Sequence, residues 1–192
     1  DDCVAIDAGC LAMSCSAKQR ENIRDVILTH THLDHIAGLP IFIDDLFASL
    51  KEPVRIHASS GMIEILERDN FNWAIYPRFS QLSNDDGPVM EYREFERGAE
   101  IQARHLTIKS VGVQHPVSAN GYLISDGDGS IGITGDTAET DEFWDELGDD
   151  KDFPDAKWDA VLAINLSSAF HLIKAVAPGM KQRRFGRIRQ LP

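Results

Sequence analysis

Three histidines and one aspartate lie within six residues of this 192-residue chain, at His30, His32, Asp34 and His35. The apolar run at residues 26–28 predicts a short buried strand before them, and the apolar residues after His35 predict a helix. The four side chains therefore occupy a tight turn from strand to helix. In an extended chain His30 and His32 point the same way and can hold one ion, while Asp34 and His35 can face a second. This set of groups favours zinc or a similar cation over a chance cluster of polar residues.

Two further residues with metal-binding side chains follow predicted strands later in the chain. The pattern of alternating residues and glycine-rich turns predicts strands at residues 89–95, 101–113, 121–124 and 130–134. His115 comes just after the second of these strands, and Asp136 comes just after the fourth. Alone, each would be an ordinary turn residue. Together, at the edge of a sheet, they are expected to approach the turn at residues 30–35.

Two other segments allow more than one interpretation. Asp7 ends a strand predicted at residues 4–6, where it could orient a ligand histidine or simply form a turn. Residues 71–79 are rich in aromatic side chains and contain Arg78. This segment could stack a flat ring and present Arg78 to an anion, or it could pack as the core of a loop. The residue pattern leaves both questions open.

Charge divides the chain into two parts. Residues 1–150 carry 11 Lys/Arg and 28 Asp/Glu, a net charge of −17, whereas residues 151–192 carry 8 and 3, a net charge of +5. Such an abrupt change of sign predicts a boundary near residue 150. The acidic first part also argues against a nucleic-acid polymer as partner, because contact with a phosphate backbone requires a basic face.

Hydropathy and cysteine content bear on the cellular location. No run reaches the 18 apolar residues of a membrane span, so no membrane partner is expected. The three cysteines, Cys3, Cys10 and Cys15, are odd in number and form no Cys-x-x-Cys pair. This pattern favours a reducing compartment and a cytoplasmic location. Because the chain begins with Asp1 rather than methionine, export by a signal peptide stays untested.

Residues 1 to about 148 resemble the metallo-β-lactamase superfamily. The resemblance rests on four matching motifs: Asp7-Ala8-Gly9, His30-x-His32-x-Asp34-His35, His115 and Gly135-Asp136-Thr137. It implies an α+β protein built as an αββα sandwich, which we expect to be incomplete at both ends and to be followed by a helical C-terminal tail.

The same resemblance implies a two-metal site. Its expected ligands are imidazoles and carboxylates at His30, His32, His115, Asp34, His35 and Asp136. The first three would hold one ion, the next two would hold a second, and the last would bridge both. Zinc is the expected metal, with manganese or iron as alternatives. Asp34 and Asp136 are the expected catalytic carboxylates.

Within the superfamily the likeness is strongest to bacterial 3′,5′-cyclic-nucleotide phosphodiesterases, through residues 28–40, 71–77 and 115–123. The implied reaction is hydrolysis of a small phosphodiester by a hydroxide that two metal ions activate. A homo-oligomer is compatible with this interpretation. The alternatives are a lactone, thioester or RNA phosphodiester hydrolase of the same fold, or an inactive fragment.

Residues 153–189 resemble the central helix of short-chain dehydrogenases, most strongly 3-hydroxybutyrate dehydrogenases, with Asn165 at the position of the family's helix asparagine. No glycine-rich cofactor loop and no Tyr-x-x-x-Lys pair accompany this segment, so it cannot act as a dehydrogenase. We therefore expect a hydrolase domain at residues 1–150 joined to an unrelated segment at residues 151–192; a divergent native helix is the alternative. In this superfamily a final histidine further along the chain completes the shell of the second ion; His171 is the only histidine after Asp136, and hence the only candidate for that ligand.

Overall fold

The computed structural model describes residues 3–147, together with residues 174, 177, 178 and 180–183. The chain divides into two compact units, Asp1–Gly148 and Asp149–Pro192. The described residues of the second unit are helical, whereas Asn165 and His171 lie outside the described residues. No helix among the residues described here is long and apolar enough to cross a membrane.

A four-stranded parallel sheet carries the turn at residues 30–35. Its strands, in spatial order, are β1 (Cys3–Ile6), β2 (Ile23–Ile27), β3 (Val54–Ala58) and β6 (Met90–Glu94). All neighbouring pairs run parallel. Parallel strands need crossover connections that cover the faces of the sheet, which explains why β2 and β3 are mostly buried.

Helices cover one face of this parallel sheet. They are α1 (Leu11–Ser14), α2 (Ala17–Asn22), α3 (Leu33–Ile36), α4 (Leu39–Leu46) and α5 (Ser60–Ile65), with short helical turns η1 (Phe47–Ser49), η2 (Leu66–Asn70) and η3 (Phe79–Gln81). Helix α4 shows why they pack here. Its buried side chains Leu39, Phe42, Ile43 and Leu46 recur at helical spacing and join the same core cluster as Val26 of β2.

The second sheet is antiparallel. Its strands, in spatial order, are β10 (Ser130–Ile133), β9 (Ala119–Ser125), β8 (Leu106–Val113) and β7 (Glu100–Ala103). A separate two-stranded ribbon joins β4 (Ser83–Asn84) to β5 (Gly87–Pro88). Helix α6 (Asp141–Leu147) covers the outer face through Phe143, which packs with Val111 and Ala119. A Cβ atom at Gly121 would lie 2.6 Å from the Phe143 ring, so only glycine leaves room for that ring.

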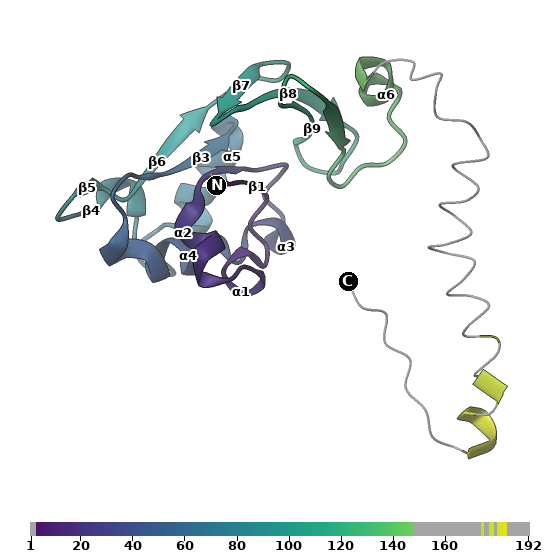
Figure 1. Ribbon diagram of the computed structural model, residues 1–192, viewed down its shortest axis with the longest axis horizontal. Coiled ribbons are helices and arrows are strands. Elements are labelled where there is room, and N and C mark those ends of the chain that lie inside the picture. Colours follow the sequence, from purple (N-terminus) through teal and green to yellow (C-terminus); the bar gives the residue numbers. More distant parts are fainter. Residues whose placement is uncertain (1–2, 148–173, 175–176, 179, 184–192) are drawn as a thin grey trace. The chain divides into compact units, whose positions relative to one another are not determined.

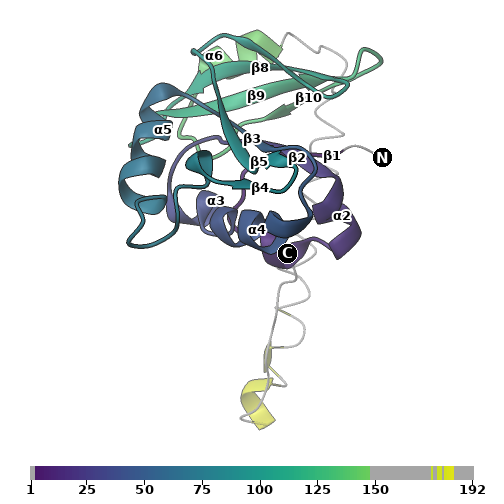
Figure 2. The same cartoon turned by 90° about the vertical axis from the view of Figure 1, so that its left-hand side faces the viewer.

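The two sheets pack face to face. One core cluster contains Ile27 of β2 together with Ile101, Ile108 and Tyr122 of the antiparallel sheet. The layers therefore run from helices to parallel sheet, to antiparallel sheet, to α6, as Figures 1 and 2 show. This arrangement confirms the α+β class and the αββα sandwich predicted from the sequence.

The prediction of one long strand at residues 101–113 was wrong. The structure divides this stretch into β7 and β8, with Ala103 paired to Leu106 across a turn made by Arg104 and His105. Arg104 adopts a left-handed backbone (φ 57°), which usually calls for glycine or asparagine, so the sequence carried no turn signal. The Arg104 guanidinium donates to Glu52 Oε1 at 2.7 Å, which helps to hold this conformation.

A buried ionic cluster links neighbouring strands of the parallel sheet. Asp25 of β2 is 2% exposed and stands opposite Arg55 of β3. Arg55 donates to both carboxylate oxygens of Asp25 at 2.8 Å, and His57 Nε2 lies 2.8 Å from Asp25 Oδ1. Burial alone would raise the pKa of Asp25, but the hydrogen bonds from Arg55 and His57 outweigh it and hold that pKa well below its usual range.

This cluster predicts a specific dependence of stability on pH. Because the folded-state pKa of Asp25 is depressed, its carboxylate stabilises the fold above the unfolded pKa of about 3.9, and this contribution is lost as the pH falls through the folded value. Asp25→Asn should lower the free energy of unfolding at pH 7 by about 3 kcal/mol, since Arg55 loses its buried partner. Urea denaturation between pH 7 and pH 2 measures both effects.

The variant should also lose less stability than the wild-type chain between pH 5 and pH 2. Asp45→Asn, which removes the exposed partner of Arg20, is the matched control and should change stability by less than about 1 kcal/mol. Parallel pH profiles for the wild type and Asp25→Asn would contradict this account of the cluster.

Candidate metal centre

The turn after β2 brings His30, His32 and His35 together because the chain passes from a strand to a helix within a few residues. β2 ends at Ile27, and α3 begins at Leu33 with His32 as its extended N-cap residue. The His35 amide donates to the His32 carbonyl at 2.9 Å, which closes the first turn of α3. His30 therefore lies three residues beyond β2 and His35 lies on α3, and their ring centroids are 4.1 Å apart.

His30, His32 and His115 form one group of converging ring nitrogens, which we call the trihistidine group. Nε2 of His30 lies 3.0 Å from Nδ1 of His32, and Nε2 of His115 lies 3.1 Å from the same nitrogen. His30 is fully buried, whereas the other two are partly exposed. The predicted approach of His115 to the turn is thus present in the structure.

His30, His35 and Asp136 form a second group, which we call the mixed group, and His30 belongs to both. Nε2 of His35 lies 3.5 Å from Asp136 Oδ1 and 3.6 Å from Asp34 Oδ2. The Asp34 side chain is 76% exposed and the Asp136 side chain is 49% exposed. The structure therefore brings five of the six sequence-predicted ligands into two adjoining groups. The sixth, Asp34, lies beside the second group. Both carboxylates lie on the solvent-exposed side of the site, which we call the open side.

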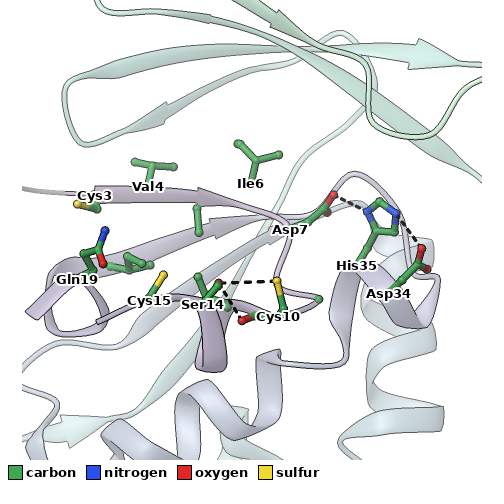
Figure 3. Close-up of a pocket in the computed structure, with 14 residues that line it drawn as sticks. Cys3, Val4, Ile6, Asp7, Cys10, Ser14, Cys15, Gln19, Asp34 and His35 are labelled. Carbon is green, nitrogen blue, oxygen red and sulfur yellow. Dashed lines mark hydrogen bonds and ion pairs between the residues drawn. The ribbon is translucent and has the colours of Figure 1, made fainter. Parts of the chain in front are cut away.

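Asp7 orients His35. Its Oδ2 lies 2.7 Å from His35 Nδ1, and Figure 3 shows the ring between Asp7 and Asp34. This contact leaves Nε2 of His35 for Asp34 and Asp136. Of the two interpretations left open by the sequence, the structure supports the orienting role. The Asp7 backbone is left-handed (φ 61°), and this turn directs its carboxylate toward the site.

Two glycines bring the Asp7 turn into contact with α3. The Ala8 amide donates to the His35 carbonyl at 2.7 Å, and the Gly38 amide donates to the Ala8 carbonyl at 2.9 Å. A Cβ atom at Gly9 would lie 1.6 Å from the Asp34 carbonyl oxygen, and one at Gly38 would lie 2.6 Å from the Ala8 carbonyl oxygen. Glycine at both positions therefore allows the close backbone packing that places Asp34 and His35.

The two histidines of the mixed group have opposite pKa shifts. Burial, reinforced by the neighbouring histidines, lowers the pKa of His30. Burial also acts to lower the pKa of His35, but its hydrogen bond to Asp7 and the charges of Asp7 and Asp136 prevail and raise it. A neutral His30 has a ring nitrogen available for a cation, while His35 lies in a negative environment that attracts one.

His115 and Asp136 lie on neighbouring loops of the antiparallel sheet. The Ala138 amide donates to the Gln114 carbonyl at 2.7 Å and joins the loops. Gly135 is left-handed (φ 60°), and a Cβ atom there would lie 3.0 Å from Thr29 Cγ2, so glycine allows Asp136 to reach the turn. A cavity of about 420 Å³ is lined by these two loops and includes His115 and Asp136 among its lining residues.

A second cavity, of about 590 Å³, runs along β1 and reaches Asp7, Asp34 and His35 at one end (Figure 3). Apolar side chains of β1 and α1 line much of it, including Val4, Ile6 and Leu11. Asp7, Asp34 and His35 form its polar end.

The aromatic segment at residues 71–79 is anchored at both ends, and its Arg78 pairs with a carboxylate of the chain. Phe71 and Phe79 are buried and pack edge to face with ring centroids 5.8 Å apart. Arg78 pairs with Glu67, its Nε lying 3.4 Å from Glu67 Oε2. Phe71 and Phe79 therefore pack as a loop core, whereas Trp73 and Ile75 between them are 57% and 65% exposed.

Thr29 is a site residue that the sequence interpretation missed. Its side chain is buried and its hydroxyl lies 3.0 Å from His30 Nδ1 and 2.7 Å from Asp7 Oδ2. The only signal was its position directly before the first histidine, at the end of a strand. The contact between Thr29 and Asp7 depends on the parallel pairing of β1 with β2, which a single sequence does not specify.

The donor set fits a divalent cation. Four nitrogen donors around tetrahedral zinc, each about 2.0–2.1 Å from the ion, lie about 3.3 Å from one another. The 3.0 Å and 3.1 Å separations within the trihistidine group are close to that spacing. The mixed group adds a carboxylate, and Asp7 supports its histidine from behind, as is common for metal-binding histidines.

Comparison with known proteins gives a family match. The sequence model of the beta-lactamase superfamily domain matches residues 6–155. The metallo-beta-lactamase fold protein YhfI from Bacillus subtilis superposes with a TM-score of 0.54 at 22% identity, over 71% of this chain and 52% of that protein. At this identity the structural similarity establishes the fold alone.

Curated relatives match different shares of the chain. A probable 3′,5′-cyclic-nucleotide phosphodiesterase of Yersinia pestis is 30% identical over 128 residues, 64% of this chain and 35% of that protein. Ribonuclease BN of Cronobacter sakazakii is 28% identical over 110 residues, 55% of this chain and 32% of that protein. D-beta-hydroxybutyrate dehydrogenase of Cupriavidus necator is 58% identical over 38 residues, 20% of this chain and 15% of that protein.

The chain therefore spans about a third or less of the length of these curated relatives. Both parts of the resemblance predicted from the sequence, the larger hydrolase-like part and the short dehydrogenase-like fragment, are confirmed.

Proposed function

This chain belongs to the beta-lactamase superfamily, and on that premise we propose that it is a metal-dependent phosphodiester hydrolase whose first candidate substrate is a 3′,5′-cyclic nucleotide. One observation carries the proposal: the trihistidine group and the mixed group share His30, and within each group the ligand atoms lie within 4.8 Å of one another. Two adjoining groups of this kind match the requirements of a two-ion hydrolytic site.

Each residue has a distinct proposed role. His30, His32 and His115 would hold one ion, and Asp34 and His35 would hold a second, with Asp136 shared between them. Zinc is the proposed metal, because imidazole nitrogens dominate the donor set. When bound, two such ions lower the pKa of water and neutralise the charge that develops on the oxygens of a displaced group.

The acidic side chains on the open side serve the substrate. Asp34 has the most exposed side chain of the candidate ligands, so its carboxylate can take a proton from the attacking water and pass it to the leaving oxygen of a bound diester. Asp7 keeps His35 in one orientation throughout, since its carboxylate accepts from the ring nitrogen that faces away from the open side.

The choice of a small phosphodiester rests on charge and on one relative. Residues 1–150 carry a net charge of −17, which disfavours a long polyanion more than a singly charged diester. The similar Yersinia pestis protein is named a probable cyclic-nucleotide phosphodiesterase. A small substrate of this class enters beside His115 and Asp136, where a cavity of about 420 Å³ is open.

RNA is the second candidate substrate, because the similar Cronobacter sakazakii protein is a ribonuclease. RNA ranks below the cyclic nucleotides only because the net charge of −17 on residues 1–150 disfavours a long polyanion. Lactones and thioesters complete the set of substrates to be compared.

The test is a substrate panel on the full chain with added zinc or manganese. We expect hydrolysis of cyclic AMP or cyclic GMP and of the general diester bis(p-nitrophenyl) phosphate, with little release from a lactone or a short RNA. His32→Ala should abolish hydrolysis, whereas His105→Ala, in the exposed β7–β8 turn, should retain it. Faster cleavage of the lactone or the RNA than of the cyclic nucleotides would contradict the proposed substrate.

A further inference from the structure

Thr29 connects the supporting carboxylate to the buried histidine that both groups share. Its amide donates to Asp7 Oδ1 at 2.8 Å, and its hydroxyl lies 2.7 Å from Asp7 Oδ2. The same hydroxyl oxygen lies 3.0 Å from Nδ1 of His30. Thr29 is 1% exposed, so water does not compete for these contacts.

The direction of each hydrogen bond follows from what the groups can donate. A hydroxyl has one hydrogen, and an ionised carboxylate can only accept. The Thr29 hydrogen therefore goes to Asp7 Oδ2. Toward His30 the Thr29 oxygen can then act only as an acceptor, so His30 Nδ1 must carry a hydrogen. In a neutral ring, this leaves Nε2 of His30 without a hydrogen and directed toward Nδ1 of His32, 3.0 Å away.

We propose that Thr29 is a positioning residue that fixes the tautomer of His30 and so makes its Nε2 available as a metal ligand. This inference rests on the proposed metal site. Asp7 then supports both histidines of the mixed group: it accepts directly from His35 Nδ1, and it acts on His30 through the Thr29 hydroxyl. One carboxylate thereby aligns ligand atoms for both groups.

The Thr29 hydroxyl also lies 3.4 Å from His35 Nδ1, but Asp7 Oδ2 is closer to that nitrogen, at 2.7 Å. The other contacts of Thr29 do not involve the hydroxyl. The Asn120 amide donates to the Thr29 carbonyl at 3.0 Å, and Gly135 approaches the Thr29 methyl group. Valine keeps the branched shape and every backbone bond but lacks the hydroxyl, whereas serine keeps the hydroxyl but lacks the methyl group. Thr29→Val and Thr29→Ser therefore separate the proposed role from packing.

The first measurement needs no variant. Long-range ¹⁵N–¹H spectra of the metal-free full chain report which ring nitrogen of His30 carries the hydrogen. We expect Nδ1–H and an unprotonated Nε2; a ring with its hydrogen on Nε2 would overturn the proposal, whether or not any variant folds.

The second measurement is zinc affinity by competition with a chromophoric chelator. Thr29→Val should weaken binding by about 10- to 100-fold, the usual effect of losing a group that supports a metal-binding histidine, and Thr29→Ser should stay within about threefold of the wild type. Equal affinities for Thr29→Val and the wild type would overturn the proposal while leaving the metal site intact. Absence of zinc binding in the wild type, with His30 protonated at Nδ1, would count against the proposed function and not against the tautomer.

Discussion

His30→Ala should abolish hydrolysis and weaken zinc binding by more than about 100-fold, because His30 is the one side chain common to both ligand groups. The substitution removes a ligand of the first ion, and it also removes the ring that lies 4.1 Å from the His35 ring, so it disturbs both groups at once. It also leaves the Thr29 hydroxyl without its ring partner in a fully buried position. Equilibrium dialysis against zinc, together with the diester assay, measures both effects.

Two further histidine variants, His115→Ala and His105→Ala, provide comparisons for the zinc binding of His30→Ala. His115→Ala removes a ligand from the trihistidine group alone, so one of the two zinc equivalents should be retained more strongly than in His30→Ala. His105→Ala, an exposed histidine outside both groups, should bind zinc like the wild type. Zinc binding in His30→Ala equal to that of the wild type would contradict the shared role of His30.

Gly9→Ala should lower the free energy of unfolding by about 3 kcal/mol or more and should impair zinc binding. A Cβ atom at this position would lie 1.6 Å from the Asp34 carbonyl oxygen, and the clash is with backbone, which cannot rotate away. The turn after β1 would have to move off α3 and break the hydrogen bond from Ala8 to the His35 carbonyl. Urea denaturation and zinc titration on the same samples measure the two consequences.

Gly61→Ala is the matched control for Gly9→Ala. Gly61 lies in helix α5, and an alanine Cβ atom at this position would meet no other atom within 4 Å. Alanine should therefore be neutral or should stabilise the fold by up to about 1 kcal/mol, because it favours the helix more than glycine does. Equal stability of Gly9→Ala and the wild type would contradict the close packing of the Asp7 turn on α3.

Much of the site could be predicted because its residues follow simple rules of strand and helix geometry. His30, His32, Asp34 and His35 are close in sequence, so their convergence needs only the turn between β2 and α3. His115 and Asp136 each follow a predicted strand, and these positions indicated that both side chains approach the same turn. The α+β class followed from the resemblance of these motifs to the metallo-β-lactamase superfamily.

What could not be predicted depends on contacts between segments far apart in the chain. Thr29 acquires its role only because β1 pairs with β2 and brings Asp7 to the same edge of the sheet. The Asp25–Arg55 pair depends on the register of β2 against β3, which hydropathy does not specify. The turn at Arg104 was not predicted because an arginine with a left-handed backbone, hydrogen-bonded to the distant Glu52, takes the place of the usual glycine or asparagine.

The metal content of the purified full chain tests the central claim most directly. After saturation with zinc and removal of excess metal, elemental analysis should give two zinc equivalents per chain, and His30→Ala should reduce this value to less than one. Retention of less than one equivalent by the wild-type chain would contradict the proposal that the two groups sharing His30 form a metal centre.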